Sequence, residues 1–250
     1  MTILNLKLNK ASKLINFLKR FQSIDNSLLL EISDSEIKAK SHTPEKSVVK
    51  YAAVPLDEIF SEYSDITEDI KFGIYNIKKF ADSCKFFGET DFEMNITCDT
   101  LNGETVGTTI VLKNSALNIE FQCAGLKLFT YISDDVLTNK VMRGFNSPKV
   151  EFVLPKEQQA KLSSLFSIED YSKVTFLKKG KTIQVKGKSF DLVVLEDNNL
   201  KSIDDCSLSI FKQHYAFIDN EDADVYITDD TIIFVSKESD TKMIVGEAQG

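Results

Sequence analysis

Two histidines and four cysteines are the side chains of this sequence best suited to nucleophilic, acid–base or metal chemistry. His42 lies in a loop-like stretch beside Pro44, and His214 lies in a short basic segment, so neither belongs to an evident Ser-His-Asp or Cys-His arrangement. The cysteines are Cys84, Cys98, Cys123 and Cys206. Because they form no C-x-x-C pair and have no neighbouring histidine, we expect buried free thiols in a reducing compartment.

Phosphate and metal motifs are also missing from the sequence. There is no G-x-x-x-x-G-K-S/T loop and no G-x-G-x-x-G after a strand, so nucleotide binding has no support. The acidic run from Asp219 to Asp224 lacks the central Gly and the closing Glu of a calcium loop, and we expect a solvated turn. We therefore expect no catalytic residue, no metal, no cofactor and no enzymatic activity. Scattered carboxylates leave no local signature, so an enzyme built on them stays open as an alternative.

Positive charge is concentrated in four helix-like segments. Residues 9–24, 75–88, 155–167 and 208–218 carry net charges of +4, +2, +1 and +1. The whole chain has a net charge of -8, so the rest of the sequence is strongly acidic. This acidity argues against nucleic-acid binding over the whole surface but not against binding at the basic segments.

The charges in these segments are sorted by face. At the helical period, Leu14, Ile15, Leu18 and Phe21 fall on one side of the first segment, and its lysines fall on the other. Lysine and arginine on an exposed helix face can contact phosphates without reading bases. The residues that we expect to face DNA are Lys10, Lys13, Lys19, Arg20, Lys78, Lys79, Lys85, Lys161 and Lys212. The alternative is that these are ordinary amphipathic helices with solvated basic faces.

An internal repeat indicates two related domains in tandem. Residues 91–97 match residues 222–228, with an acid, a second acid two positions on, an apolar residue and then Ile-Thr. Residues 36–40 similarly match 182–186, and 109–112 match 231–234, in the same order in both halves. With 42% hydrophobic residues, each half can bury a core. We expect an N-terminal domain over 1–133, a connector over 134–149 and a C-terminal domain over 150–250.

Each half reads as a strand, a helix, several strands, a second helix and further strands. Helices are expected over 9–24, 76–87, 155–167 and 210–218. Strands are expected over 3–8, 27–32, 36–40, 48–54, 92–98, 107–113, 117–123, 151–154, 173–178, 182–186, 190–196, 225–228, 231–236 and 241–245. The sheets should therefore carry the fold.

This organisation resembles the sliding DNA clamps. The nearest likeness is to the processivity clamps of T-even-like bacteriophages, in the two-domain branch that includes proliferating cell nuclear antigen. The stretches that carry the resemblance are Glu151-Phe152, the helix from Lys156 through Leu165, residues 179–187 and residues 72–80. The resemblance implies an α+β DNA-clamp fold, with two pseudo-repeat domains, antiparallel sheets outside and two short helices from each domain inside.

The resemblance also implies a function and partners. Three chains would join head to tail in a homotrimeric ring around duplex DNA, with the basic helices lining the hole. A DNA polymerase and a clamp loader would dock on an apolar pocket near the connector. Val141, Met142 and Phe145 are candidates for that pocket, or they simply hold the connector against the second domain.

Two other functions remain open at this point. One is a monomeric processivity factor that holds DNA on an open basic face, and the other is a β-rich interaction module with no DNA role. No run of apolar residues approaches the length of a membrane span. Residues 3–8 alternate between apolar and polar, as in a strand, and do not form the continuous apolar run of a signal peptide. We expect a cytoplasmic protein, in the host cytoplasm if it is viral, with no membrane partner.

Overall fold

A computed structural model describes residues 2–129, 148–239 and 241–248. The chain divides into two compact units, the first made of residues 1–41 and 51–132 and the second of residues 42–50 and 133–250. Residues 42–50, which the sequence analysis assigned to the N-terminal domain, thus belong with the second unit. The connector expected over 134–149 lies outside the described residues except at its last two positions, and it stays a prediction.

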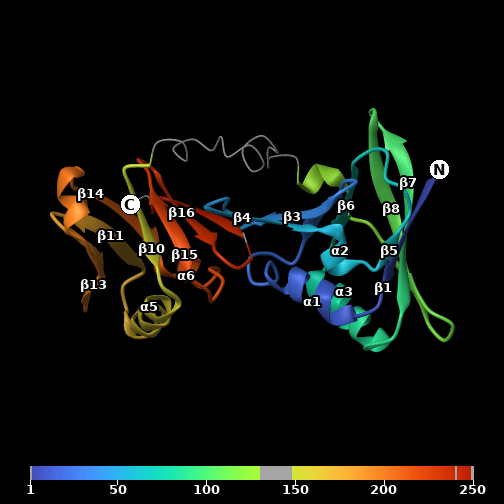
Figure 1. Cartoon of the computed structure of the whole chain (residues 1–250), viewed down its shortest axis with the longest axis horizontal. Coiled ribbons are helices and arrows are strands. Elements are labelled where there is room, and N and C mark those ends of the chain that lie inside the picture. The colour runs from blue at the N-terminus through green and yellow to red at the C-terminus, as the bar shows by residue number, and fades with distance from the viewer. Residues whose placement is uncertain (1, 130–147, 240, 249–250) are drawn as a thin grey trace. The chain divides into compact units, whose positions relative to one another are not determined.

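The first unit is a mainly antiparallel sheet with helices packed against it (Figure 1). Its strands are β1 (Thr2–Leu8), β2 (Leu28–Ile32), β3 (Glu36–His42), β4 (Val48–Pro55), β5 (Glu62–Tyr63), β6 (Ile70–Ile74), β7 (Phe92–Leu101), β8 (Glu104–Lys113) and β9 (Asn118–Gln122). Its helices are α1 (Ala11–Lys19), α2 (Leu56–Ile59), α3 (Ile77–Cys84) and the 3₁₀ turns η1 (Lys85–Phe87) and η2 (Leu126–Leu128). The strand order is β4-β3-β2-β6-β8-β7-β1-β5, with β9 paired to β8. The β6–β8 pairing is parallel.

The second unit contains two four-stranded antiparallel arrangements, β10-β15-β16-β17 and β13-β12-β11-β14. The strands are β10 (Val150–Leu154), β11 (Lys173–Lys179), β12 (Thr182–Lys186), β13 (Asp191–Glu196), β14 (Cys206–Phe211), β15 (Ala223–Ile227), β16 (Thr231–Ser236) and β17 (Lys242–Gly246). The helices are α5 (Lys156–Ile168), η3 (Asn198–Ser202) and α6 (Lys212–Tyr215). Residues 42–50 join this unit beside β17, where the amide of Gly246 donates to Ser47 O at 2.8 Å.

The two units repeat one topology, which confirms the repeat seen in the sequence. β1 pairs with β7, and β7 with β8, just as β10 pairs with β15 and β15 with β16. β6-β2-β3 likewise corresponds to β14-β11-β12. The matched segments 91–97 and 222–228 fall on β7 and β15, the equivalent strands. The fold class expected from the sequence, a β-rich α+β fold, is therefore correct.

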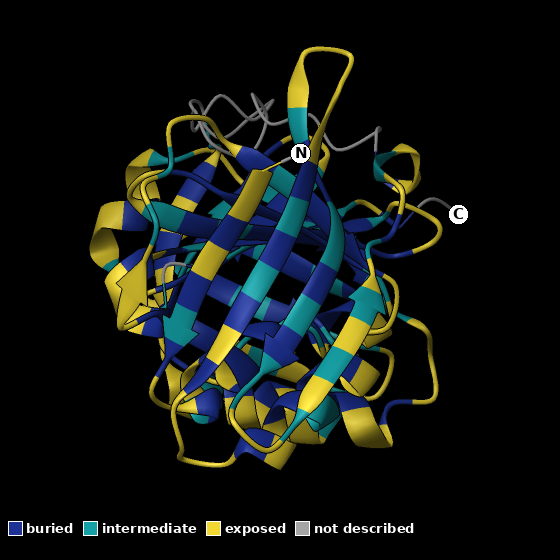
Figure 2. Cartoon of the chain, turned by 90° about the vertical axis from the view of Figure 1, so that its right-hand side faces the viewer, coloured by how far each residue is buried: buried dark blue, intermediate teal, exposed yellow. Residues whose placement is uncertain are grey.

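Alternating side chains build the core of the first unit. Along β1 the burial alternates, so that Leu4, Leu6 and Leu8 point inward, and β7 alternates in the same way. Figure 2 shows this banding of buried and exposed residues along the sheet strands of the first unit. The inward leucines meet the apolar faces of α1 and α3, which pack against each other.

A cluster of packed aromatic rings lies in the core of the second unit. Tyr215 packs edge-on against Phe166 and Phe234, with ring centroids 4.8 and 6.1 Å away, and Phe176 packs against Phe234 at 6.1 Å. These rings come from α5, α6, β11 and β16, so they bring the helices and both sheets of this unit together.

The structure corrects two expectations in the second unit. The helix expected over 210–218 is shorter, because Ile210 and Phe211 belong to β14 and α6 begins at Lys212. The acidic run 219–224 is not a solvated turn. Glu221 is buried and accepts hydrogen bonds from the amides of residues 238 and 239, and Asp222 accepts from the amide of Lys156 at the start of α5.

Candidate nucleic-acid interface

Helix α1 presents a basic face because its apolar residues recur at helical spacing. Ala11, Leu14, Ile15, Phe17 and Leu18 are buried, as the sequence pattern predicted for most of this face. Lys10 at the N-cap and Lys13 and Lys19 within the helix are exposed. Lys19 lies in the last turn, where a cation interacts favourably with the helix dipole.

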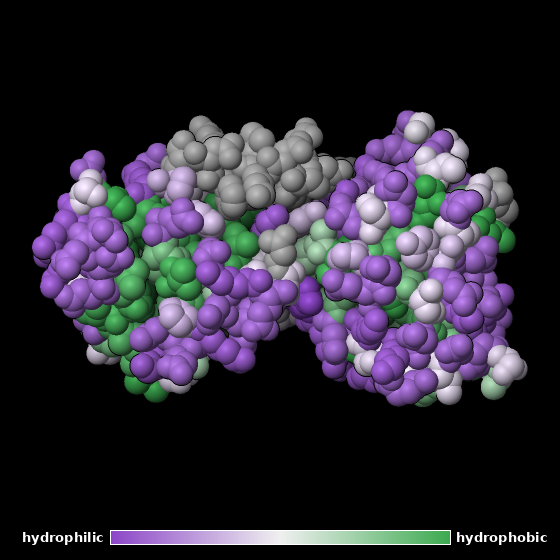
Figure 3. All heavy atoms as spheres, viewed as in Figure 1, coloured by the Kyte–Doolittle hydropathy of each residue, from purple (hydrophilic) through white to green (hydrophobic). Residues whose placement is uncertain are grey.

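Helix α3 repeats the arrangement. Its N-cap residue Asn76 accepts a hydrogen bond from the amide of Lys79 at 2.8 Å, which fixes where the helix begins. Ile77, Phe80, Ala81 and Cys84 are buried, whereas the neighbouring positions carry exposed lysines. These exposed lysines are Lys78, Lys79 and Lys85. In Figure 3, hydrophilic side chains cover the part of the first unit where these two helices lie in Figure 1.

Two of the predicted DNA-facing residues of the first unit have local partners. The Arg20 guanidinium lies 5.9 Å from the centre of the Phe17 ring, and the residue is half-buried. The Lys85 ammonium lies 2.5 Å from Asp82 Oδ1. The hydrogen bond from Lys85, followed by the charges of Lys85, Lys78 and Lys19, holds the pKa of the Asp82 carboxyl below its ordinary value. Lysines of both α1 and α3 therefore act on the same carboxylate, that of Asp82.

The second unit contributes less positive charge than the sequence suggested. Lys161 is exposed on α5, as expected. Lys212 is different, because its ammonium donates to Phe166 O at 3.2 Å and also to Glu169 O, at the C-terminal end of α5. Its charge is directed at helix carbonyls, so Lys212 is withdrawn from the candidate interface. The expected partner-binding residues Val141, Met142 and Phe145 lie outside the described residues.

His214 meets Glu45 and Ser47, which are distant from it in the sequence, in the second unit. His214 Nε2 lies 3.1 Å from Ser47 Oγ and 3.2 Å from Glu45 Oε1, and Ser47 Oγ donates to Glu45 at 2.8 Å. In a nucleophilic triad the serine and the acid contact opposite nitrogens of the imidazole, but here both contact Nε2, and the buried Nδ1 has no partner among the described residues. Burial lowers the pKa of His214, and the charge of Glu45 opposes this shift. The cluster holds residues 42–50 in place rather than activating the serine.

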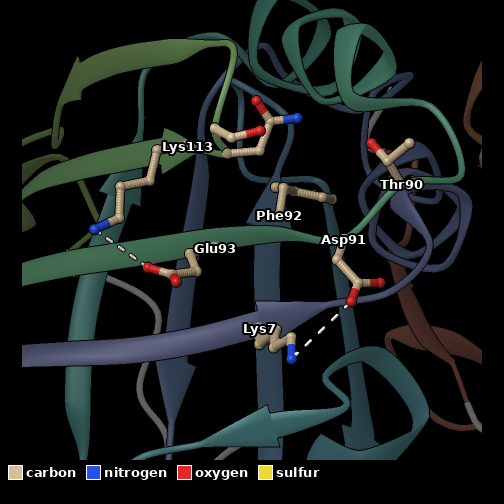
Figure 4. Close-up of a pocket in the computed structure, with 8 residues that line it drawn as sticks. Lys7, Thr90, Asp91, Phe92, Glu93 and Lys113 are labelled. Carbon is tan, nitrogen blue, oxygen red and sulfur yellow. Dashed lines mark ion pairs between the residues drawn. The ribbon is translucent and has the colours of Figure 1, made fainter.

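A pocket of about 530 Å³ lies in the first unit at the start of β7 (Figure 4). Its charged residues are already paired: Lys113 lies 3.2 Å from Glu93, and Lys7 lies 4.0 Å from Asp91 and 3.0 Å from Glu62. The other lining residues are Thr90, Phe92, Asn114 and Ser115. The described lining includes no cysteine or histidine, and its carboxylates lie in ion pairs with lysines.

Metal and thiol chemistry find little support in the part of the chain that is described. No group of three or more His, Cys, Asp or Glu side chains there is arranged to hold a metal ion. All four cysteines are free, with Cys84 and Cys98 buried and the other two half-buried. Burial raises the pKa of Cys84 and of Cys123 to about 12, which keeps both thiols protonated and weakly nucleophilic. None of the described helices is long and apolar enough to cross a membrane.

Comparison with solved structures shows what kind of fold presents this basic face. The chain superposes on the DNA polymerase III beta chain of Streptococcus pneumoniae TIGR4 with a TM-score of 0.71 at 9% identity. It also superposes on the A. fulgidus PCNA that binds the C-terminal region of FEN-1, with a TM-score of 0.67 at 10% identity. The fold is that of a sliding DNA clamp. No protein-family model matches the sequence, and no curated protein sequence matches it.

The share of each clamp that this chain covers differs between the bacterial and the archaeal proteins. The superposition covers 100% of this chain but 66% of the S. pneumoniae chain, and the same shares hold for a Pseudomonas aeruginosa DnaN clamp bound to griselimycin (TM-score 0.69, 9% identity). With the A. fulgidus PCNA it covers 99% of both chains. The chain thus spans about two thirds of the length of these bacterial clamps and nearly the whole of the archaeal one. These neighbours are clamps, and none of them indicates a catalytic family.

The sequence did not indicate which strands lie at the edges of the sheets. Among the described strands, β9 pairs with β8 alone and β13 pairs with β12 alone. A pocket of about 380 Å³ lies beside β9 and is lined by Ile74, Tyr75, Phe80 and Phe121, among others. On β13, Val193 is 46% exposed. The pairing pattern shows that these two strands are edge strands, as β5, β10 and β14 are among the described strands.

Proposed function

We propose that this chain is a sliding clamp that encircles duplex DNA as a ring and tethers a replicative DNA polymerase to its template. The observation that carries the proposal is the exposed basic face of α1 and α3 on a clamp fold, in a chain whose net charge is -8. These two packed helices carry a net positive charge, whereas the chain as a whole is acidic.

The charges suit a protein that must slide. Lys10, Lys13, Lys19, Lys78 and Lys79 attract the phosphate backbone without reading sequence, so every register along the duplex is equivalent. The net negative charge of the chain disfavours DNA binding over the whole surface. Encirclement then replaces tight binding, so the attached polymerase seldom leaves the template.

Ring closure is proposed to use the free edges β9 and β13. An interface between two different surface patches is head-to-tail, and it closes into a ring when the rotation between subunits allows. Exposed edge strands pair readily with another chain. The pocket beside β9 and the exposed Val193 on β13 supply apolar area on the two sides of such a joint. We propose three chains per ring, in line with the length match to the archaeal PCNA.

The partners are proposed from the same fold. A DNA polymerase and a clamp loader would dock near the connector, and Val141, Met142 and Phe145 remain predictions for that contact. The likeness to T-even-like phage clamps and the cytoplasmic location also remain predictions.

A charge-reversal variant tests the DNA contacts. Changing Lys13, Arg20, Lys78 and Lys85 to Glu should abolish DNA-dependent stimulation of a cognate polymerase and leave the oligomeric mass unchanged. Light scattering over a range of concentrations measures that mass, and three chains of 28.2 kDa give about 85 kDa. Unaltered stimulation would show that these helices do not face DNA. A monomer at every concentration would instead leave an open-faced processivity factor.

A further inference from the structure

Asp82 is the single acidic residue within the two basic segments 9–24 and 75–88 of the first unit. Its carboxylate Oδ1 lies 2.5 Å from the Lys85 ammonium, and the side chains of Asp82 and Lys85 are 46% and 54% exposed. The contact is thus made at the surface of the basic face, where a DNA phosphate would arrive.

Helix stability does not account for an acid at this position. Asp82 lies in the last turn of α3, where the partial negative charge of the helix end disfavours a carboxylate. The i,i+3 pair with Lys85 is a surface contact of the kind that contributes little to folding. An asparagine or a serine at position 82 would leave the buried face of α3 unchanged.

The Asp82 carboxylate interacts electrostatically with lysines of the basic face. The hydrogen bond from Lys85 and the charges of Lys85, Lys78 and Lys19 all hold the pKa of the Asp82 carboxyl below its ordinary value. The carboxylate is therefore ionised at neutral pH, and its charge interacts with cations of both helices. By symmetry of the interaction, its charge weakens the attraction that those cations exert on phosphate.

We propose that Asp82 is a positioning residue that limits the strength of phosphate binding, because it holds Lys85 and offsets the charge of Lys19 and Lys78. The proposal rests on the proposed function, since it assumes that this face meets DNA. A phosphate must displace the Asp82 carboxylate to reach Lys85, and the carboxylate returns when the phosphate leaves. The contact between Lys85 and the backbone is thereby exchanged rather than added, which limits what Lys85 contributes to binding.

Asp82→Asn tests the proposal with little steric change. The matched control is Asp69→Asn, because Asp69 is exposed and the whole of β6 (Ile70–Ile74) separates it from the start of α3. Both variants remove one negative charge from the full-length chain. The probe is a fluorescent 30-base-pair duplex, and its affinity is measured by anisotropy between 50 and 200 mM salt.

We expect Asp82→Asn to bind the duplex roughly fivefold more tightly at low salt, because Lys85 becomes free to contact a phosphate. One additional phosphate contact also steepens the dependence of log affinity on log salt by about 0.9. Asp69→Asn should change the affinity less than twofold. In a Lys85→Met background, most of the gain from Asp82→Asn should disappear.

The outcomes distinguish an error in the role of Asp82 from an error in the proposed clamp function on which that role rests. If the quadruple Lys/Arg→Glu variant binds the duplex as wild type does, both the function and the role of Asp82 are wrong. If wild type does not bind the duplex, the role of Asp82 in limiting phosphate binding is wrong. If the quadruple variant binds weakly but Asp82→Asn behaves like Asp69→Asn, only the role of Asp82 is wrong. A gain that survives Lys85→Met would show that Asp82 does not act through Lys85.

Discussion

The Lys50 ammonium lies 2.5 Å from the Asp219 carboxylate, and Lys50 is 1% exposed. The same ammonium donates to Phe217 O at 2.9 Å. Both partners belong to the second unit, although they stand 169 residues apart in the sequence. The pair therefore fixes residues 42–50, which come from the first repeat, against the segment that follows α6.

The Lys50–Asp219 pair should be worth far more than a surface pair. Asp219→Ala removes the carboxylate that neutralises a buried ammonium, and we expect a loss of about 3 kcal/mol in the free energy of unfolding. Lys50→Met should cost less, about 1 to 2 kcal/mol, because the Asp219 side chain is 18% exposed and can be hydrated. Urea unfolding measures both. Glu62→Gln, which breaks the exposed pair with Lys7, serves as the control and should have no measurable effect. Equal losses from Asp219→Ala and Glu62→Gln would show that the Lys50 pair is not buried in solution.

The lowered pKa of His214 predicts a stability that falls with acid. As the pH drops below 6.5, the ordinary pKa of histidine, the unfolded chain binds a proton at His214. The folded chain binds this proton only when the pH reaches its own lower pKa. The unfolded state binds more protons in that window, so the free energy of unfolding falls as pH falls, and it is level above the window. His214→Gln should remove this slope in urea titrations between pH 7 and pH 5.

Glu45 provides the control for that slope. Its charge opposes the lowering of the His214 pKa, so Glu45→Gln should lower that pKa further and steepen the loss of stability in acid. The pKa of Glu45 is itself held low, first by its own backbone amide and then by Ser47, so its own contribution is lost only below the ordinary glutamate range. A Glu45→Gln slope shallower than wild type would contradict the assignment.

Periodicity was sufficient to predict most of the fold. The alternating apolar residues of β7 and the helical spacing in α1 are local patterns, and burial follows both of them. The same spacing placed Lys13 and Lys78 on exposed faces. β14 shows the limit: Leu208 and Ile210 alternate into the core as strand residues do, but the nearby basic residues suggested a helix from 210.

Contacts between distant residues could not be predicted from one sequence. Lys212 has the same charge as Lys161, and only the folded chain shows that its ammonium reaches the end of α5. Ser47 and His214 are 167 residues apart, and no local pattern links them. The free edges of β9 and β13 depend on which strands pair, and a strand's own residues do not determine that.

We predict that removing the Tyr215 hydroxyl does not lower the stability of the protein. This hydroxyl is buried without a hydrogen-bond partner in the described residues, and burial raises the pKa of the phenol. Because an unpaired buried hydroxyl is costly, Tyr215→Phe should leave stability unchanged or raise it by about 1 kcal/mol. Phe234→Ala, in contrast, opens a cavity beside the same ring and should cost about 3 to 4 kcal/mol. A loss above about 1 kcal/mol in Tyr215→Phe would mean that a water or another group satisfies the hydroxyl.

Edge prolines should separate the two sides of the proposed joint. The amide of Cys123 points to β8 and that of Ala124 points away from it, so alternation places the amide of Glu120 at the free edge of β9. On β13, the bond from Gly187 to Phe190 O similarly places the amide of Val193 at the free edge. Proline at such positions removes an outward donor and leaves the existing ladder intact. Glu120→Pro and Val193→Pro should each reduce the mass in light scattering from that of three chains to that of one.

Mixing the two variants distinguishes a head-to-tail joint from a symmetric one. The Val193→Pro chain keeps an intact β9 edge and the Glu120→Pro chain keeps an intact β13 edge, so one joint can still form between them. Two chains of 28.2 kDa should then associate as a capped dimer of about 56 kDa that cannot close. A joint between two β9 edges would instead leave the Val193→Pro variant dimeric by itself. Unchanged circular dichroism and thermal midpoints in both variants ensure that the loss of the ring reflects the edges and not misfolding.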